Sequence, residues 1–321
     1  MTSFKKIALA TAISAFSLQA YASDFTRIQD IVYGEAQIVK NGQIENRELW
    51  MDAYLPEANA DEPTPAIFMT FGGSFHRGNP RHPYLMEGAQ TTSMQEYCEK
   101  FVKQGYACFN IDYRVAPEHP IPTYQGYSNE DLDMSPVLDI HGQVNIVRSI
   151  MELPPLDFSN PDDVAVVEKT VLAGAEDLRS AVEFVRKNAE SYNIDPDKIV
   201  LGGFSAGAIN SLNVAHGMKV PVAGVMMLGT AEIGFDIKKT AKSANEISPI
   251  LMFQGQYDLP ATLIRTPALL EHYKNIQADF SYNWVPGASH FYPSGSVSLA
   301  GDGTRHSVEE RMLSFIERVV Q

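Results

Sequence analysis

A serine flanked by glycines is the first feature of this sequence that indicates chemistry. The segment Gly203-Phe-Ser-Ala-Gly207 has the pattern G-x-S-x-G; it follows the apolar run Ile199–Leu201 and precedes a helix-compatible segment at about 208–216. A strand, a glycine-flanked serine and a helix in this order are what a nucleophile elbow requires, because the sharp turn leaves no room for Cβ atoms beside the serine. The helix N-terminus would also direct N–H groups at a developing oxyanion. We predict that Ser205 is a nucleophile; the alternative is a glycine-rich loop with a serine cap.

A serine hydroxyl is a weak nucleophile unless a base accepts its proton and an acid orients that base. Four histidines follow Ser205. Those in or beside helical segments, which suit packing, surface or capping roles, are His216, His272 and His306. His290 instead ends a loop just after a predicted strand and just before the final helical region, where the catalytic histidine of an α/β-hydrolase lies. We predict that His290 is the base.

The orienting acid is sought among the aspartates that follow the nucleophile. Asp258 ends the segment Ile250–Asp258, directly after an apolar run typical of a buried strand. The alternatives fit less well, since Asp279 leads into a strand and Asp302 lies in a Gly-Asp-Gly turn. Asp258 would accept the imidazole N–H, fix the tautomer and stabilise the imidazolium.

An oxyanion hole requires backbone N–H groups that converge on one point. Gly72-Gly73-Ser74 directly follows the apolar run Ala66–Phe71, and glycines there would let the backbone approach a substrate. With the N–H of Ala206, we predict oxyanion donors at Gly73 and Ser74; taken alone, the two glycines would also fit an ordinary turn.

The elements that must position these residues alternate between strand and helix. Apolar runs typical of buried strands occur at 66–71, 199–201 and 250–253, and further strand patterns occur at 107–111, 222–228 and 280–285. Helical patterns occur between or after them at 92–103, 175–191, 266–277 and 307–320. Repeated βα units predict an α/β fold with a mostly parallel sheet and helices on both faces. Two alternating runs joined by Asn41-Gly42 predict an antiparallel hairpin before it, whereas 24–33 reads as weakly helical.

About 60 residues separate Tyr113 from the helix predicted at 175, far more than a βα connection needs. We predict that this insertion, at about 115–174, forms a small cap with helical segments at 137–152 and 161–171. It starts from the carboxyl end of a strand, the edge at which ligands bind in open α/β sheets. We expect its apolar residues to face inward, with Ile150 and Val167 in contact with substrate; the full set is Val137, Ile146 and Ile150 on one side and Val164, Val167 and Val171 on the other. An inert surface elaboration is the alternative.

The first 22 residues have the features of a secretory signal peptide. Lys5 and Lys6 precede an apolar run, and Ala20-Tyr21-Ala22 is an A-x-A cleavage site. We therefore expect a secreted or periplasmic protein that is cleaved after Ala22 and consists of one domain, 23–321, with no stable membrane insertion.

Two cysteines, Cys98 and Cys108, lie in a predicted helix and in the strand that follows it. A helix that folds back on its own strand can bring them together, and an oxidising compartment lets them bond. We predict a disulfide; the alternative is two separate buried thiols.

Five motifs in one order resemble the α/β-hydrolase carboxylesterases, in particular the hormone-sensitive-lipase-like and feruloyl-esterase-like (BD-FAE-like) branch. The motifs are Phe71-Gly-Gly-Ser-Phe75, Asp112-Tyr-Arg-Val-Ala-Pro-Glu-His-Pro120, Gly203-Phe-Ser-Ala-Gly207, Gly255-Gln-Tyr-Asp258 and Gly287-Ala-Ser-His290. The resemblance implies an α/β-hydrolase fold and catalysis by Ser205, Asp258 and His290, with oxyanion donors at Gly73, Ser74 and Ala206. We also expect Phe75 and Phe204 to lie beside the substrate. The lipase-like H-G-G-G reads Phe71-Gly-Gly-Ser74 here, and Phe204 replaces the usual aspartate.

Composition narrows the classes of partner. The chain has 321 residues, 45% of them hydrophobic, and a formal net charge of −14, which disfavours nucleic acid, anionic lipid and anionic substrates. No CxxC, HExxH or GxGxxG is present, so we expect no cofactor and no metal. We predict a secreted serine carboxylesterase for small-to-medium uncharged esters. The alternatives are a serine peptidase or other acyl hydrolase of the same fold, and a non-catalytic binding protein.

Overall fold

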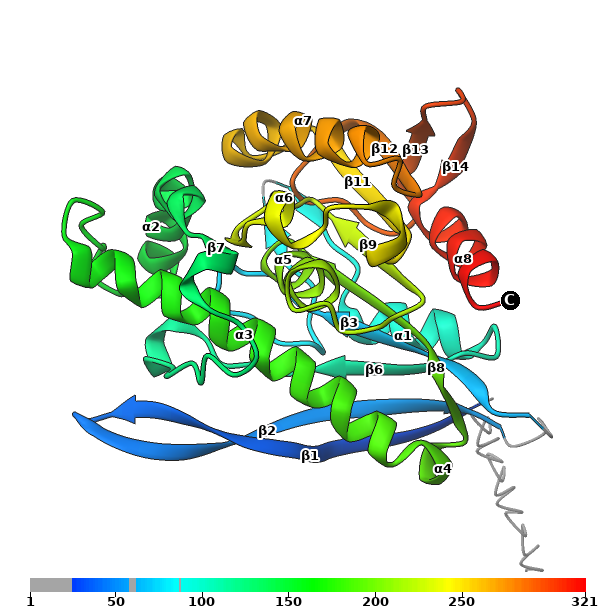
Figure 1. The fold of residues 1–321 in the computed structure, drawn as a ribbon, viewed down its shortest axis with the longest axis horizontal. Coiled ribbons are helices and arrows are strands. Elements are labelled where there is room, and N and C mark those ends of the chain that lie inside the picture. The colour runs from blue at the N-terminus through cyan, green and yellow to red at the C-terminus, as the bar shows by residue number, and fades with distance from the viewer. Residues whose placement is uncertain (1–24, 58–61, 87) are drawn as a thin grey trace, which may run out of the picture.

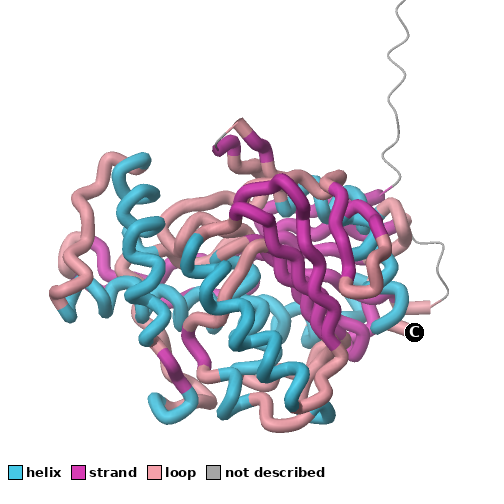
Figure 2. The backbone as a smooth tube through the Cα atoms, turned by 90° about the horizontal axis from the view of Figure 1, so that it is seen from above, coloured by secondary structure: helices cyan, strands magenta, loops and turns pink. Residues whose placement is uncertain are grey.

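The computed structural model describes residues 25–57, 62–86 and 88–321. The predicted signal peptide, residues 1–22, lies outside the described residues. Figure 1 shows a sheet that runs through the molecule with helices on both sides, and Figure 2 shows the same strands as one twisted layer. Among the described helices, none is both long and apolar enough to cross a membrane.

The main sheet has ten strands in the order β1-β2-β6-β3-β8-β9-β11-β12-β13-β14. Their bounds are β1 Phe25–Lys40, β2 Gln43–Pro56, β3 Thr64–Thr70, β6 Ala107–Ile111, β8 Ile194–Phe204, β9 Gly224–Leu228, β11 Ile250–Tyr257, β12 Phe280–Ser289, β13 Val297–Ala300 and β14 Arg305–Ser307. The six strands from β6 to β12 pair in parallel, and the two outer strands on each side pair antiparallel. The short strands β4 Leu85–Met86 with β5 Ala89–Gln90, and β7 Leu132–Asp133 with β10 Gly234–Phe235, form two small separate sheets.

The central strands are apolar on both faces because each face is covered by helices. In β3, Ala66 and Phe68 belong to one core cluster, and Ile67 and Met69 to the other. The helices are α1 Met94–Val102, α2 His141–Ile150, α3 Pro161–Lys187, α4 Ala189–Tyr192, α5 Ala206–Leu212, α6 Ile237–Thr240, α7 Pro260–Asn275 and α8 Val308–Val319. Helices α1 and α8 supply residues to the cluster that contains Ile67 and Met69. Helices α3 and α7 supply the greater part of their buried apolar residues to the cluster that contains Ala66 and Phe68, and α5 supplies residues to both.

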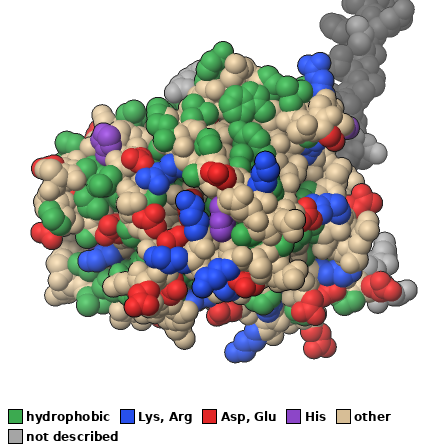
Figure 3. All heavy atoms as spheres, turned by 45° about the horizontal axis from the view of Figure 1, so that its top comes forward, with side chains coloured by type: hydrophobic (Ala, Val, Ile, Leu, Met, Phe, Trp, Pro, Cys, Tyr) green, Lys and Arg blue, Asp and Glu red, His purple; other side chains and the backbone are tan. Residues whose placement is uncertain are grey.

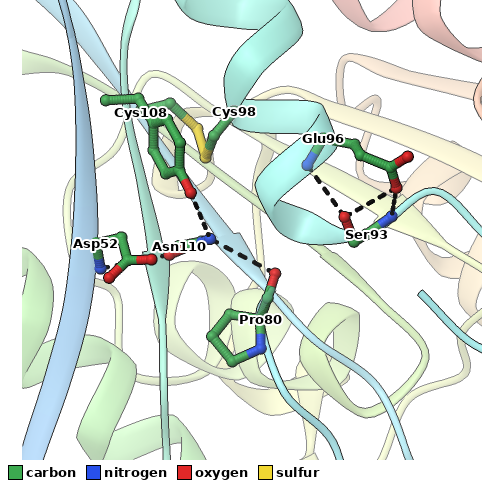
Figure 4. Close-up of a disulfide and its surroundings, with 8 residues drawn as sticks. Asp52, Pro80, Ser93, Glu96, Cys98, Cys108 and Asn110 are labelled. Carbon is green, nitrogen blue, oxygen red and sulfur yellow. Dashed lines mark hydrogen bonds between the residues drawn. A yellow bond between two sulfur atoms is a disulfide. The ribbon is translucent and has the colours of Figure 1, made fainter. Parts of the chain in front are cut away.

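The predicted disulfide is confirmed. Cys98 of α1 is bonded to Cys108 of β6, with their Cα atoms 5.1 Å apart (Figure 4). Helix α1 begins at a capping box in which the Ser93 hydroxyl accepts from the N–H of Glu96 and the Glu96 carboxylate accepts from the N–H of Ser93. The bond therefore ties a well-capped helix to the strand that follows it.

Three predictions of local structure differ from the fold. The segment predicted as weakly helical before Tyr33 is strand from Phe25 on, because it pairs with β2 along nearly its whole length. The two helices predicted at 161–171 and 175–191 are one helix, α3, for most of their length. The insertion predicted at 115–174 thus ends inside α3, and its separate part is the stretch up to 160, which contains α2. The strands β13 and β14 were not predicted.

Charged side chains on the face shown in Figure 3 are mixed rather than sorted by sign, and hydrophobic side chains gather in its upper part. This face therefore carries no continuous basic patch of the kind that binds nucleic acid.

His216 gives the fold a pH-dependent stability. It is buried in the segment 213–217; its Nδ1 lies 2.9 Å from the Tyr273 hydroxyl, and its Nε2 lies 3.1 Å from the Ser248 carbonyl oxygen. Burial lowers the pKa of His216 to about 4. The unfolded chain binds this proton near pH 6.5 and the folded chain does not, so stability falls as the pH is lowered from 6.5 to 4.

We expect His216→Gln to remove part of this acid sensitivity, because the amide can replace both hydrogen bonds without binding a proton. The contribution is about 3 kcal/mol between pH 7 and 4. Urea unfolding of wild type and variant at several pH values measures it. His306→Gln, at an exposed site, is the matched control. Equal pH dependence in wild type and His216→Gln would contradict the assignment.

Candidate active site

Ser205 lies at a sharp turn between β8 and α5. Its backbone angles are φ +53° and ψ −119°, a conformation that non-glycine residues rarely adopt. A Cβ atom on Gly203 would lie 2.4 Å from the carbonyl carbon of Gly207, and one on Gly207 would lie 2.0 Å from the carbonyl oxygen of Thr70. Both glycines are therefore required by close backbone approach, and the turn leaves Ser205 partly exposed.

His290 and Asp258 follow two neighbouring parallel strands. Tyr257, at the end of β11, pairs with Ser289, at the end of β12, so the next residue of each strand emerges at the same edge of the sheet. Nδ1 of His290 lies 2.6 Å from Oδ1 of Asp258, and both side chains are buried. Because a carboxylate only accepts, Nδ1 carries the proton and Nε2 is left as the acceptor.

Backbone donors fix the carboxylate, and aromatic rings fix the imidazole. Asp258 Oδ1 accepts from the N–H of Leu259 at 2.7 Å, and Oδ2 accepts from the N–H of Gly255 at 3.3 Å. The His290 ring has its centroid 4.9 Å from that of Phe204 and 5.1 Å from that of Phe291.

The predicted oxyanion loop follows β3. The residues Gly73, Ser74 and Phe75 all have positive φ, and the carbonyl of Gly73 accepts from the N–H groups of His76 and Arg77. Ala206 is the first residue of α5, so its N–H has no acceptor within the helix.

Two tyrosines hold this loop from outside it. Tyr113 stacks on Phe71 with ring centroids 4.3 Å apart and donates to the Phe71 carbonyl at 3.1 Å. Tyr84 donates to the Gly72 carbonyl at 3.0 Å. Arg114, next to Tyr113, is buried and donates to Asp177 at 2.8 Å. The segment Asp112–Arg114 therefore supports the loop rather than reaching into the site.

Ser205 lines two cavities. The large cavity, of about 430 Å³, is lined by Ser74, Phe75, Asp139–Gln143, Ile146, Ser205, Ala206, Ile209, Gly229–Ala231, Ile233 and Leu259–Thr262. The small cavity, of about 10 Å³, is lined by Gly73, Ser74, Arg77, Tyr84, Gln143, Val147, Phe204, Ser205, His290 and Phe291. Ser205, His290 and the predicted oxyanion loop thus meet at the small cavity, and the large cavity shares Ser74, Gln143 and Ser205 with it.

The four side chains predicted to contact substrate are distributed unevenly. Phe75 lines the large cavity and Phe204 the small one. Ile150 and Val167 line neither cavity: Ile150 is 47% exposed at the end of α2, and Val167 is fully buried in the core. The placement of these two at the substrate was wrong because α2 turns Gln143, Ile146 and Val147 toward the site one turn earlier, and α3 packs Val167 inward.

Several cavity residues were not identified from the sequence. Gln143 lies in the insertion and, with Ser74 and Ser205, lines both cavities. Arg77 lines the small cavity, and Leu259–Thr262 at the start of α7 line the large one. The sequence has one local indication that Arg77 lies near the site: it follows the Gly72-Gly73 pair by only a few residues.

Gly229 lies against the predicted base, His290, and was also not identified from the sequence. It follows β9 with φ +58°, and a Cβ atom there would lie 3.0 Å from Nδ1 and 3.1 Å from Cε1 of His290. We expect Gly229→Ala to displace the imidazole and lower kcat by about 10- to 100-fold. Gly42→Ala is the matched control, since Gly42 also has positive φ but no atom within 4 Å of a Cβ. Equal kcat in the two variants would contradict this role.

Among the described residues, no group of three or more histidine, cysteine, aspartate or glutamate side chains is arranged to hold a metal ion. The arrangement that the structure does provide is a hydroxyl, an imidazole and a carboxylate, the set required for acyl transfer through a covalent serine intermediate.

Comparison with protein families shows to which family the chain belongs. The BD-FAE family profile matches residues 51–145 and 164–259, more than half of the chain. The chain belongs to the BD-FAE family. The two matched ranges contain the loop after β3, the elbow and Asp258, while His290 lies beyond them. The resemblance stated from the sequence motifs is confirmed.

One curated relative of this BD-FAE protein is endo-1,4-beta-xylanase B of Butyrivibrio fibrisolvens, 61% identical over 137 residues. The alignment covers 39% of this chain and 21% of the relative, so the chain spans about a fifth of the length of the protein that it matches.

Solved structures confirm the α/β-hydrolase fold. Esterase Est2 of the planctomycete Thermogutta terrifontis with propionate bound superposes with a TM-score of 0.55 at 16% identity, covering 90% of this chain and 92% of Est2. Est2 phosphorylated by paraoxon gives a TM-score of 0.54 at 16% identity, covering 92% of this chain and 91% of Est2.

Proposed function

We propose that this BD-FAE protein is a serine carboxylic ester hydrolase acting through an acyl-enzyme on Ser205. The observation that carries the proposal is that Ser205 and His290 line one cavity while His290 Nδ1 lies 2.6 Å from Asp258. The family, the α/β-hydrolase fold and the esterases of that fold support the same reaction class.

The reaction divides into two acyl transfers. Ser205 Oγ attacks the ester carbonyl carbon while its proton passes to Nε2 of His290, and the oxyanion is stabilised by the N–H groups of the loop at Ser74 and of Ala206. The tetrahedral intermediate expels the alkoxide, which takes the proton from His290 and leaves as the alcohol. Water then attacks the acyl-Ser205 by the same route and releases the acid.

The large cavity supports a small-to-medium uncharged acyl group. The greater part of its lining is apolar, and its volume of about 430 Å³ lies at the lower end of ordinary ligand pockets. A net charge of −14 opposes the approach of anionic substrates.

We propose further that the insertion before α3 caps this site. Its residues Asp139–Gln143 and Ile146 line the large cavity, and Asp139 is ion-paired with Arg265 of α7, a helix whose first turn also lines the cavity. This ion pair links the insertion to α7.

Ile209 tests the assignment of the large cavity to the acyl group. Its side chain lines the cavity from α5, so Ile209→Ala enlarges the space for longer acyl chains. We expect the ratio of kcat/KM for hexanoate to acetate esters to rise by about tenfold, or 1–3 kcal/mol per altered contact. Val167→Ala, a buried truncation outside the cavity, is the matched control. The same chain-length profile in both variants would contradict the assignment.

Export is part of the proposal. Lys5, Lys6, the apolar run and Ala20-Tyr21-Ala22 support cleavage after Ala22, and the Cys98–Cys108 bond is consistent with folding in an oxidising compartment. Expression of the full sequence in a Gram-negative host should yield exported protein whose first residue is Ser23. Protein retained in the cytoplasm with Met1 intact would contradict it.

A fluorophosphonate probe tests the proposed function. We expect stoichiometric labelling at Ser205 and hydrolysis of p-nitrophenyl esters. Labelling with hydrolysis of peptide anilides but not of esters would favour the serine peptidase. Absence of labelling in correctly folded protein would favour a non-catalytic binding protein. Acetylated xylan belongs in the ester screen because the B. fibrisolvens relative is named a xylanase.

A further inference from the structure

The two cavities beside Ser205 differ in their access to the base. His290 lines the small cavity but not the large one. In the proposed reaction His290 gives its proton to the departing alkoxide, so the alkoxide oxygen must lie against the imidazole. The small cavity is therefore the place where the alcohol part of the ester begins, and the acyl part extends into the large cavity.

Arg77 is the one basic side chain other than His290 that lines the small cavity. Its Nε is buried and has no hydrogen-bond partner. The guanidinium lies over the ring of Tyr84, 5.5 Å from the centroid, and Nη2 donates only to the sulfur of Met86, at 3.5 Å. Buried donors in proteins are almost always paired. The Nε of Arg27 is also unpaired among the described residues, but only Arg77 of the two lines the cavity beside Ser205, where a ligand can supply the acceptor.

Other arginines show how unusual this is for the chain. Among the described residues, every arginine except Arg77 and the exposed Arg305 donates to at least one oxygen. The position of Arg77 is also fixed, because its N–H donates to the carbonyl of Gly73 and its own carbonyl accepts from Tyr84. These contacts fix the backbone of Arg77 beside the predicted oxyanion loop, and the contacts with Tyr84 and Met86 place its guanidinium at the small cavity.

We propose that Arg77 binds a hydrogen-bond-accepting oxygen on the alcohol part of the ester, a few atoms from the ester oxygen. This inference rests on the proposed ester hydrolysis and adds the recognition of the leaving group. The volume of about 10 Å³ is close to that of a single water, so one oxygen atom fits beside the guanidinium. Guanidinium favours either a neutral ether or hydroxyl oxygen or, more strongly, a carboxylate.

Paired esters of equal shape test this assignment. Butyl butanoate and 2-methoxyethyl butanoate differ by one CH₂ replaced by oxygen in the alcohol. We expect Arg77→Met to lower kcat/KM for the methoxyethyl ester by about 10- to 100-fold, the value of a hydrogen bond to a charged group, and to change the butyl ester by less than about threefold. Carboxymethyl butanoate distinguishes the two oxygen sources, since a carboxylate preference gives it the larger loss.

Two further measurements separate the ways in which the proposal can fail. Arg305→Met removes the same charge far from both cavities and should leave the ratio between the esters unchanged. The rate of fluorophosphonate labelling of Ser205 shows that Arg77→Met retains an intact elbow. An equal loss on all esters, or no loss, would overturn the alcohol subsite while the esterase stands. Wild-type protein that hydrolyses neither ester and leaves Ser205 unlabelled would overturn the proposed function and, with it, the subsite.

Discussion

Replacing Ser205 by alanine is expected to lower kcat for ester hydrolysis by about 10⁶. In the proposed mechanism the substitution removes the oxygen that forms the acyl-enzyme, while the loop after β3 and both cavities stay in place. The variant should fold normally, because the Ser205 side chain makes no hydrogen bond that holds β8 or α5 together; the turn is held instead by the Ser205 N–H, which donates to the Leu228 carbonyl at 2.8 Å.

Steady-state kinetics with a p-nitrophenyl ester, together with fluorophosphonate labelling, measures this loss. Ser211→Ala is the matched control, since Ser211 lies on the same helix, is fully buried and donates to the Gly207 carbonyl without lining either cavity. Activity above about a tenth of wild type in Ser205→Ala would show that another residue is the nucleophile.

Much of the catalytic framework could be predicted because it depends on short stretches of sequence. The strands at 66–71 and 199–201 are continuous apolar runs, since each face of a central parallel strand is covered by helices. The elbow could be recognised because only glycine fits at 203 and 207, where backbone atoms of Gly207 and of Thr70, respectively, come within 2.5 Å of a Cβ position. Asp258 and His290 could be selected because each ends a strand of the same parallel sheet, and such ends share one edge.

What could not be predicted depends on contacts between segments distant in sequence. Gly174 lies between the segments 161–171 and 175–191, which were predicted as separate helices, yet α3 is continuous there. A Cβ atom at Gly174 would lie 2.8 Å from the side-chain nitrogen of Asn210 on α5, so this glycine permits the two helices to approach closely. A glycine inside a helical pattern marks close packing as readily as it marks an end.

The wall of the large cavity is a second example. Ile146 and Ile150 lie four residues apart on the same face of α2, so periodicity treats them alike. Only the docking of α2 over the elbow decides that Ile146 lines the cavity while Ile150 lies beyond its edge. Arg77 is similar: neither charge nor spacing indicates that its guanidinium would be left without an oxygen partner.

Asp258→Asn is expected to lower kcat by about 10⁴, less than the loss from Ser205→Ala. Asp258 accepts hydrogen bonds from three N–H donors, on His290, Leu259 and Gly255, and both of its oxygens are used. An amide has only one oxygen, so in either orientation its NH₂ group faces at least one of these donors. The negative charge that stabilises the imidazolium is also lost, while the nucleophile and the oxyanion loop remain.

Asp258→Asn and Ser205→Ala should therefore differ in their reaction with a fluorophosphonate as well as in the size of the loss in kcat. Asp258→Asn should still be labelled by a fluorophosphonate, slowly, whereas Ser205→Ala should not be labelled at all; KM should change little, because Asp258 lines neither cavity. Asp302→Asn is the matched control, since it removes the same charge from an exposed turn where Asp302 accepts from the N–H of Thr304. Asp258 contacts His290 and Asp302 does not. Equal kinetics in the two variants would therefore mean that the Asp258 carboxylate does not orient His290, and that another residue is the catalytic acid.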